Sequence, residues 1–167
     1  FLKNTICIFT SESIFVSSMI SDITNLMFEE TLIQGKEEIF DLSLYNEDNN
    51  FGQFVADLYT KLNSSTEVIV FKNFKAGSSS VRKVISELIK KGSFVVPTNS
   101  QNIVINSNNK YFVLISSGSV EDFIPFIGQD TFEKIIDVLK IEELSEEDIS
   151  KMIQNLVNTM ILKARAE

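Results

Sequence analysis

The stretch 67-EVIVFKNF-74 decides the expected fold. After Glu67 it has an apolar, largely β-branched run, Val68 to Phe71, which is followed by two polar residues, Lys72 and Asn73. A run that is apolar at successive positions is typical of a strand buried on both faces, as in a parallel sheet covered by helices. Because ligands of such sheets bind beyond the carboxyl ends of the strands, Lys72 and Asn73 are expected at a functional position.

Other short apolar runs alternate with amphipathic segments along the chain. Strands are predicted over 5–10, 37–45, 66–71, 110–116 and 137–141, and a small hairpin over 93–97 and 102–106. Helices are predicted over 11–28, 51–62, 78–92 and 145–166, with short helical pieces over 119–128 and 130–136. Serines before the third helix and Gly92 after it are typical start and stop signals. The alternation predicts an α/β protein with a central, mostly parallel, five-stranded sheet in a three-layer α/β/α arrangement.

The composition limits the class of partner. The 167 residues carry a net charge of −8, which disfavours binding to a nucleic-acid backbone. The basic cluster of Arg82, Lys83, Lys90 and Lys91 is interpreted as the solvated side of a helix.

Cys7, the single cysteine, lies in an apolar run and is expected to be buried. No stretch has the length of a membrane span, and we expect a soluble, cytoplasmic fragment of a longer protein.

The segment joining the first strand to the first helix, 9-FTSESIFVSS-18, occupies the place of a phosphate-binding loop. It contains neither glycine nor lysine. A P-loop needs glycine so that backbone amides can approach the phosphates, and lysine to neutralise them. The sequence therefore lacks the usual means of binding a nucleotide at this position.

The spacing of these segments nevertheless resembles a known family. The family's "DMSEY" matches 41-DLSLY-45, its "VVLLDEIEKAH" matches 68-VIVFKNFKAGS-78, and its "VIIMTSN" matches 112-FVLISSG-118. Its P-loop segment lies over 8–28 and its "FLNRIDEVVVFRPL" over 131–144. In hydrophobic skeleton and order, the chain resembles the second ATPase module of the AAA+ Clp unfoldases and disaggregases. The resemblance implies a P-loop-like AAA+ large subdomain over 1–144 and the first helix of the C-terminal lid over 145–167.

The resemblance also identifies where the family's catalytic residues would fall. The P-loop lysine falls on valine and the following magnesium-binding hydroxyl on serine. The Walker B acids fall on lysine and asparagine, the sensor asparagine on glycine, and the arginine finger on lysine. These vestigial nucleotide-site positions are Val16, Ser17, Lys72, Asn73, Gly118 and Lys134. Without these groups, neither magnesium nor the charge of the transition state is stabilised, so no catalytic residue is assigned.

The implied function is structural or regulatory: a Clp-like module without ATP hydrolysis, whose partners are other subunits of a Clp-type ring or an active Clp ATPase or protease. No cofactor is expected. Two alternatives stay open. One is an ATP-binding Clp chaperone subunit with an unconventional site for ATP and magnesium; the other is a module that binds a peptide or protein in the blocked cleft. The family's aromatic pore loop corresponds only to 46-NEDNNF-51, and we interpret it as deleted.

Several side chains have two interpretations at this stage. Lys72 either pairs with Glu12 or Asp41 in place of magnesium, or is solvated. Ser17 and Ser18 either cap the first helix and bind an anion or have no such role. The phenylalanines either fill a vacated nucleotide pocket or belong to the ordinary core; they are Phe9, Phe15, Phe71 and Phe74. With no histidine in the chain, neither a hydrolase triad nor a metal site is expected.

Overall fold

A computed structural model describes residues 4–10, 13–30, 37–97, 100–141 and 146–166, with the side chains of 13–18, 146 and 166 outside the description. The five main strands form one parallel sheet in the order β2-β3-β6-β1-β7. Their bounds are β1 Thr5–Thr10, β2 Glu37–Asp41, β3 Val68–Lys72, β6 Tyr111–Ser116 and β7 Asp137–Ile141. Strands β4 (Ser93–Pro97) and β5 (Asn102–Asn106) form the separate antiparallel hairpin that the sequence predicted.

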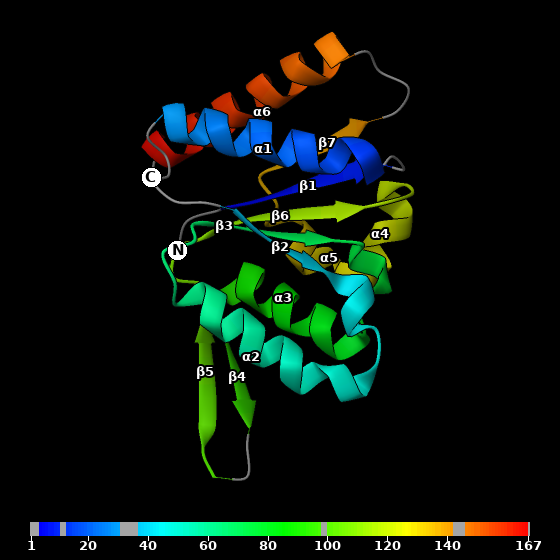
Figure 1. Cartoon of the computed structure of the whole chain (residues 1–167), viewed down its shortest axis with the longest axis vertical. Helices are drawn as coiled ribbons and strands as arrows, with labels where there is room; N and C mark the ends of the chain where they lie inside the picture. The colour runs from blue at the N-terminus through cyan, green and yellow to red at the C-terminus, as the bar shows by residue number, and fades with distance from the viewer. Residues whose placement is uncertain (1–3, 11–12, 31–36, 98–99, 142–145, 167) are drawn as a thin grey trace.

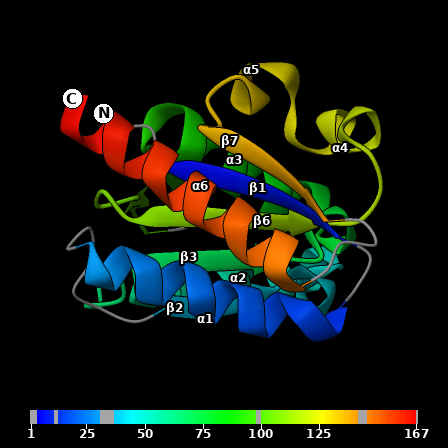
Figure 2. The same cartoon turned by 90° about the horizontal axis from the view of Figure 1, so that it is seen from above.

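Helices cover both faces of this sheet (Figure 1). Helices α1 (Ser13–Glu29) and α6 (Glu146–Ala166) lie on one face; the opposite face carries α2 (Phe51–Leu62), α3 (Ser79–Lys91), α4 (Val120–Ile127) and α5 (Gln129–Phe132). Figure 2 shows α6 and α1 side by side over the strands. The predicted three layers and five-stranded sheet are confirmed.

Two hydrophobic cores follow from the alternation of side chains along each strand. In β1, Ile6 and Ile8 pack under α1 and α6, whereas Cys7 and Phe9 pack toward the helices of the other face. Burial raises the pKa of the Cys7 thiol, which keeps it protonated as a small apolar side chain. Both sides of the strand are buried, which is why the sequence shows a continuous apolar run.

Helix α6 shares its core with α1 rather than forming one of its own. The residues it contributes are Ile153, Leu156, Val157, Met160 and Ile161, all buried. The expected boundary at 144/145 lies outside the described residues. The division of the chain into a large subdomain and the beginning of a lid stays a prediction.

The second strand is shorter than predicted. It ends at Asp41, and Leu42–Tyr45 forms a 3-10 helix, η1. Oδ1 of Asp41 accepts hydrogen bonds from the Ser43 backbone N–H at 3.1 Å and from Ser43 Oγ at 2.6 Å. This local turn competes with the strand ladder and ends it. The prediction of a strand through residue 45 was wrong for this reason.

The third helix has the ends that its sequence predicts. Ser78 Oγ accepts from the Val81 N–H at 3.3 Å, and Gly92 closes the helix with a φ of +80°, donating from its N–H to the Leu88 carbonyl at 2.9 Å. Glycine adopts this left-handed conformation without a side-chain penalty. The helix thus ends where the hairpin begins, and it packs against β4.

Candidate functional site

The carboxyl ends of the strands form the candidate site. Strands β1 and β6 are neighbours, but the helices that follow them pack on opposite faces: α1 in one core, and α4 through Phe123 in the other. In open parallel sheets, such a reversal opens a crevice at the carboxyl edge, where ligands bind. Lys72 and Asn73 follow from β3 at this same edge, as the sequence predicted.

Asp41 is the centre of a hydrogen-bonded cluster at the ends of β2 and β3. In the sheet it lies opposite Lys72, and the Lys72 Nζ is 3.9 Å from Asp41 Oδ2. Asn73 Nδ2 donates to Asp41 Oδ1 at 2.8 Å, and this oxygen also accepts from the N–H and Oγ of Ser43. Of the two interpretations of Lys72, pairing with Asp41 is the one observed; Glu12 lies outside the described residues.

The backbone at Asn73 turns sharply, with φ 54° and ψ 46°. Asparagine adopts this left-handed conformation more readily than most residues. The turn starts a short 3-10 helix, η3 (Phe74–Ala76), whose first residue, Phe74, is fully buried. The conformation thus aims the Asn73 amide at Asp41 while Phe74 anchors the loop in the core.

The cluster determines the charge state of Asp41. Partial burial tends to raise the pKa of the carboxyl group, but hydrogen bonds from Asn73 and Ser43, together with the charge of Lys72, outweigh it and hold the pKa below the usual value for aspartate. Asp41 is therefore an ionised acceptor that is already supplied with protein donors. This arrangement satisfies the carboxylate without an added cation.

Gly118 follows β6 at the same edge, with a φ of +85°. A Cβ atom here would lie 2.9 Å from Lys75 Nζ and 3.4 Å from Asp122 Oδ2. The ammonium group of Lys75, from η3, thus lies against the Gly118 backbone. Both the conformation and this contact favour glycine at the position where the resemblance places the sensor asparagine.

The predicted site residues are brought together only in part. Lys72 and Asn73 belong to the Asp41 cluster, and Lys75 connects the adjoining η3 to Gly118. Lys134 lies elsewhere: it is exposed in the turn after α5, three residues before β7 begins, and therefore near the amino ends of the strands. The resemblance places the family's arginine finger at this position, and an arginine finger acts on a neighbouring subunit.

Residues 16 and 17 lie within α1, but the side chains of Val16 and Ser17 are outside the described residues. Because α1 begins at Ser13, Ser17 and Ser18 are past its first turn. They are not in a position to cap the helix, so that suggestion from the sequence was wrong.

The phenylalanines at this edge belong to the core. Phe9, Phe71 and Phe74 are 3%, 0% and 0% exposed. The rings of Phe9 and Phe74 each lie 5.2 Å, centroid to centroid, from the ring of Phe123 in α4. The core interpretation is therefore confirmed for these three, and the Phe15 side chain lies outside the described residues.

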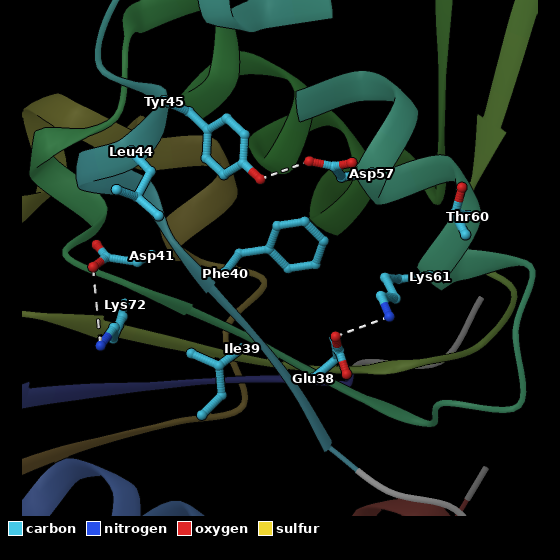
Figure 3. Close-up of a pocket in the computed structure, with 10 residues that line it drawn as sticks. All are labelled: Glu38, Ile39, Phe40, Asp41, Leu44, Tyr45, Asp57, Thr60, Lys61 and Lys72. Carbon is cyan, nitrogen blue, oxygen red and sulfur yellow. Dashed lines mark hydrogen bonds and ion pairs between the residues drawn. The ribbon is translucent and has the colours of Figure 1, made fainter. Parts of the chain in front are cut away.

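A cleft of about 530 Å³ runs beside the Asp41 cluster, along the outer strand β2 (Figure 3). Tyr45 Oη donates to Asp57 Oδ2 at 2.8 Å across it, and Lys61 Nζ lies 2.9 Å from Glu38 Oε1. Burial, reinforced by the Asp57 carboxylate, raises the pKa of Tyr45 to about 12. The sequence reasoning missed this cleft, because residues from β2 and α2 meet only in the folded chain.

Arg82 was also misjudged. The sequence analysis placed it on a solvated helix side, but its Nε donates to the Gly77 carbonyl at 2.9 Å and its Nη1 to the Phe126 carbonyl at 3.0 Å. Its guanidinium lies 4.9 Å from the centroid of the Phe126 ring. Lys90 and Lys91 instead pair with Glu87 on the helix surface. Arg82 therefore joins α3 to α4.

Within the described ranges, no group of three acidic or cysteine side chains is placed to hold a metal ion. In the same part of the chain, no helix combines the length and the apolar character needed to cross a membrane. No protein-family model matches the sequence, and none of the curated proteins matches it.

Proposed function

We propose that the chain is a Clp-like AAA+ module that has lost ATP hydrolysis and acts as a structural or regulatory part of a Clp chaperone or protease assembly. The proposal combines the family resemblance in hydrophobic spacing with the chemistry of the strand ends. The observation that carries it is the set of contacts around Asp41, where Asn73, Ser43 and Lys72 use the carboxylate as a structural acceptor.

Hydrolysis of a nucleoside triphosphate needs a magnesium ion held near carboxylates and a group that orients water. At the end of β3, Lys72 brings a positive charge and Asn73 a neutral amide. A magnesium ion beside the Lys72 ammonium would be repelled, and Asn73 has no basic group to activate water. These substitutions support a module that keeps an ATPase-like frame without the reaction.

The assembly role rests on the family resemblance, together with a folded frame that carries no groups for hydrolysis. The two buried cores and the three layers give a rigid body able to stand beside active subunits in a ring. We therefore propose other subunits of a cytoplasmic Clp-type ring, or an active Clp ATPase or protease, as partners. In this role the module adds contacts to the assembly and takes no part in the chemical step.

Calorimetric titration with ATP and magnesium, combined with a phosphate-release assay, tests the proposal. We expect neither saturable binding nor turnover, with a Clp ATPase that has intact motifs as the positive control. Turnover that disappears on Asn73→Ala or Ser17→Ala would overturn the proposal. Saturable binding without turnover would favour the ATP-binding subunit with an unconventional site.

The assembly role is tested separately by mixing the chain with a Clp ATPase and measuring the mass of the complex by sedimentation velocity. We expect a complex to form, and we expect this chain to need no ATP in order to enter it. Absence of any complex, together with binding of a peptide at the carboxyl edge of the sheet, would favour the peptide-binding alternative.

A further inference from the structure

Strand β2 is the outer strand of the sheet. It pairs with β3 on one side, and among the described residues no strand pairs with its other side. Figure 2 shows β2 at the end of the sheet, beyond β3. An outer strand has backbone N–H and C=O groups that face away from the sheet, and these can pair with another extended segment.

Two apolar side chains at this edge are exposed to solvent. Ile39 is 42% exposed, whereas Val70, its partner on β3, is fully buried. Leu44, just beyond the strand, is 69% exposed. The strand has neither lysine nor proline, but three of its five residues are acidic, and such charges discourage pairing with any strand that does not neutralise them. In Figure 3, Ile39 and Phe40 point to opposite sides of β2.

The charge around the edge is negative. Four carboxylates lie on β2 or line the cleft beside it: Glu37, Glu38, Asp41 and Asp57. Lys61 reaches Glu38 and Lys72 reaches Asp41, so among the described residues two negative charges remain, while Lys36 precedes the strand in the sequence. This local field attracts a basic segment.

The same charges disfavour a second copy of the chain. An antiparallel pair of β2 strands centred on Ile39 would place Glu37 of each copy opposite Asp41 of the other. Like charges directly opposite each other destabilise a strand pair. The chain as a whole carries a net charge of −8, which adds to the repulsion between copies.

We propose that the free edge of β2 binds an extended basic segment of a partner protein as an added strand. A lysine or arginine side chain of the segment faces Glu37, and an apolar side chain two residues along the segment packs on Ile39. Backbone hydrogen bonds supply affinity, and the alternating side chains supply specificity. This inference does not depend on the family resemblance or on the state of the nucleotide site.

A fluorescently labelled peptide Lys-Thr-Val-Thr-Lys tests the proposal by fluorescence anisotropy with the 167-residue chain. Its sequence reads the same in both directions, so it fits a parallel or an antiparallel addition. We expect it to bind about tenfold more tightly than Glu-Thr-Val-Thr-Glu. Equal affinity of the two peptides, or no binding of the lysine peptide, would overturn the proposal.

Backbone methylation separates strand addition from simple charge attraction. In a strand pair, alternate N–H groups of the peptide face the partner strand. Methylating the two threonine amides in one lysine peptide, and the valine and final lysine amides in another, should weaken binding of one about tenfold and spare the other. Equal binding of both methylated forms contradicts strand addition.

A charge reversal on the protein, Glu37→Lys, tests the same proposal. We expect this variant to reverse the preference between the two peptides, while Glu133→Lys, an exposed charge reversal after α5 with the same change in net charge, leaves the preference intact. Circular dichroism spectra of both variants serve as the control for folding. A wild-type dimer that the lysine peptide dissociates would identify a second copy as the occupant and would overturn the proposal.

Discussion

Asn73 donates a hydrogen bond from Nδ2 to Oδ1 of Asp41, 2.8 Å away, and so joins the carboxyl ends of two neighbouring parallel strands. The bond needs the amide at the end of β3 and the left-handed backbone that aims it. A carboxylate in place of Asn73 would face Asp41 with a like charge. The residues at this edge therefore support one another as a structural unit.

Asn73→Gly and Asn73→Ala separate the two contributions of this residue. Glycine keeps the left-handed backbone and loses the hydrogen bond, so we expect a loss of about 1 kcal/mol in the free energy of unfolding. Alanine also strains the backbone and should cost about 1 kcal/mol more than glycine. Urea denaturation followed by circular dichroism measures both values.

Asn46 provides the matched control, because its φ of −89° lies in the ordinary helical region. At Asn46 alanine should be no less stable than glycine. If the order of the two variants at position 73 resembled that at position 46, the left-handed conformation of Asn73 would not contribute to stability.

Gly118→Ala tests the second turn at this edge. The φ of +85° strains any residue with a Cβ, and the new methyl group would meet Lys75 Nζ. Because the end of a lysine side chain can move, most of the expected loss, about 1 kcal/mol, comes from the backbone. The double variant Gly118→Ala with Lys75→Ala should therefore recover little. Full recovery in urea denaturation would assign the loss to the clash instead.

Gly52→Ala is the control for this substitution. Gly52 lies in the first turn of α2, and no atom lies within 4 Å of an added Cβ. We expect the change to stabilise the chain by about 0.5 kcal/mol, since alanine favours the helix. A loss of stability at both glycines would point to a general effect of the methyl group.

The sequence predicted the strands and helices well because burial on both faces leaves a clear apolar pattern. The run from Val68 to Phe71 has this pattern, and β3 lies where it predicted. The end of β2 was missed because Asp41 and Ser43 form a turn through a side chain, while the apolar letters continue to Tyr45. Hydrogen bonds of a side chain determine where this strand ends, and the spacing of apolar residues gives no sign of such bonds.

The sequence predicted the location of the site but not the contacts between its side chains. The position of Lys72 and Asn73 follows from the end of a strand, but their bonds to Asp41 depend on the order of strands in the sheet. Lys75 gave no signal at all, because it reaches Gly118 from a separate segment of the chain. An aspartate two residues before a serine was the one usable sign, since this spacing favours a local turn.

The depressed pKa of Asp41 predicts a pH dependence of stability. A carboxyl group whose pKa is lower in the folded state contributes stability above its unfolded pKa, about 3.9, and loses it as the pH falls through the folded value. Asp41→Asn removes this contribution. The difference in unfolding free energy between wild type and variant should therefore be larger at pH 7 than at acid pH; a constant difference would contradict the role of the charge.

Arg82 should stabilise the contact between α3 and α4. Arg82→Lys keeps a charge but loses the fixed pair of donors to Gly77 and Phe126 and the stacking on the Phe126 ring, so we expect a loss of about 1–2 kcal/mol. Lys83→Ala, at the exposed neighbouring position, should change stability by less than about 0.5 kcal/mol. Amide hydrogen exchange should show faster opening of α4 in Arg82→Lys, because the helix loses its connection to α3. Unchanged exchange in α4 would contradict the role of Arg82 in holding α4 against α3.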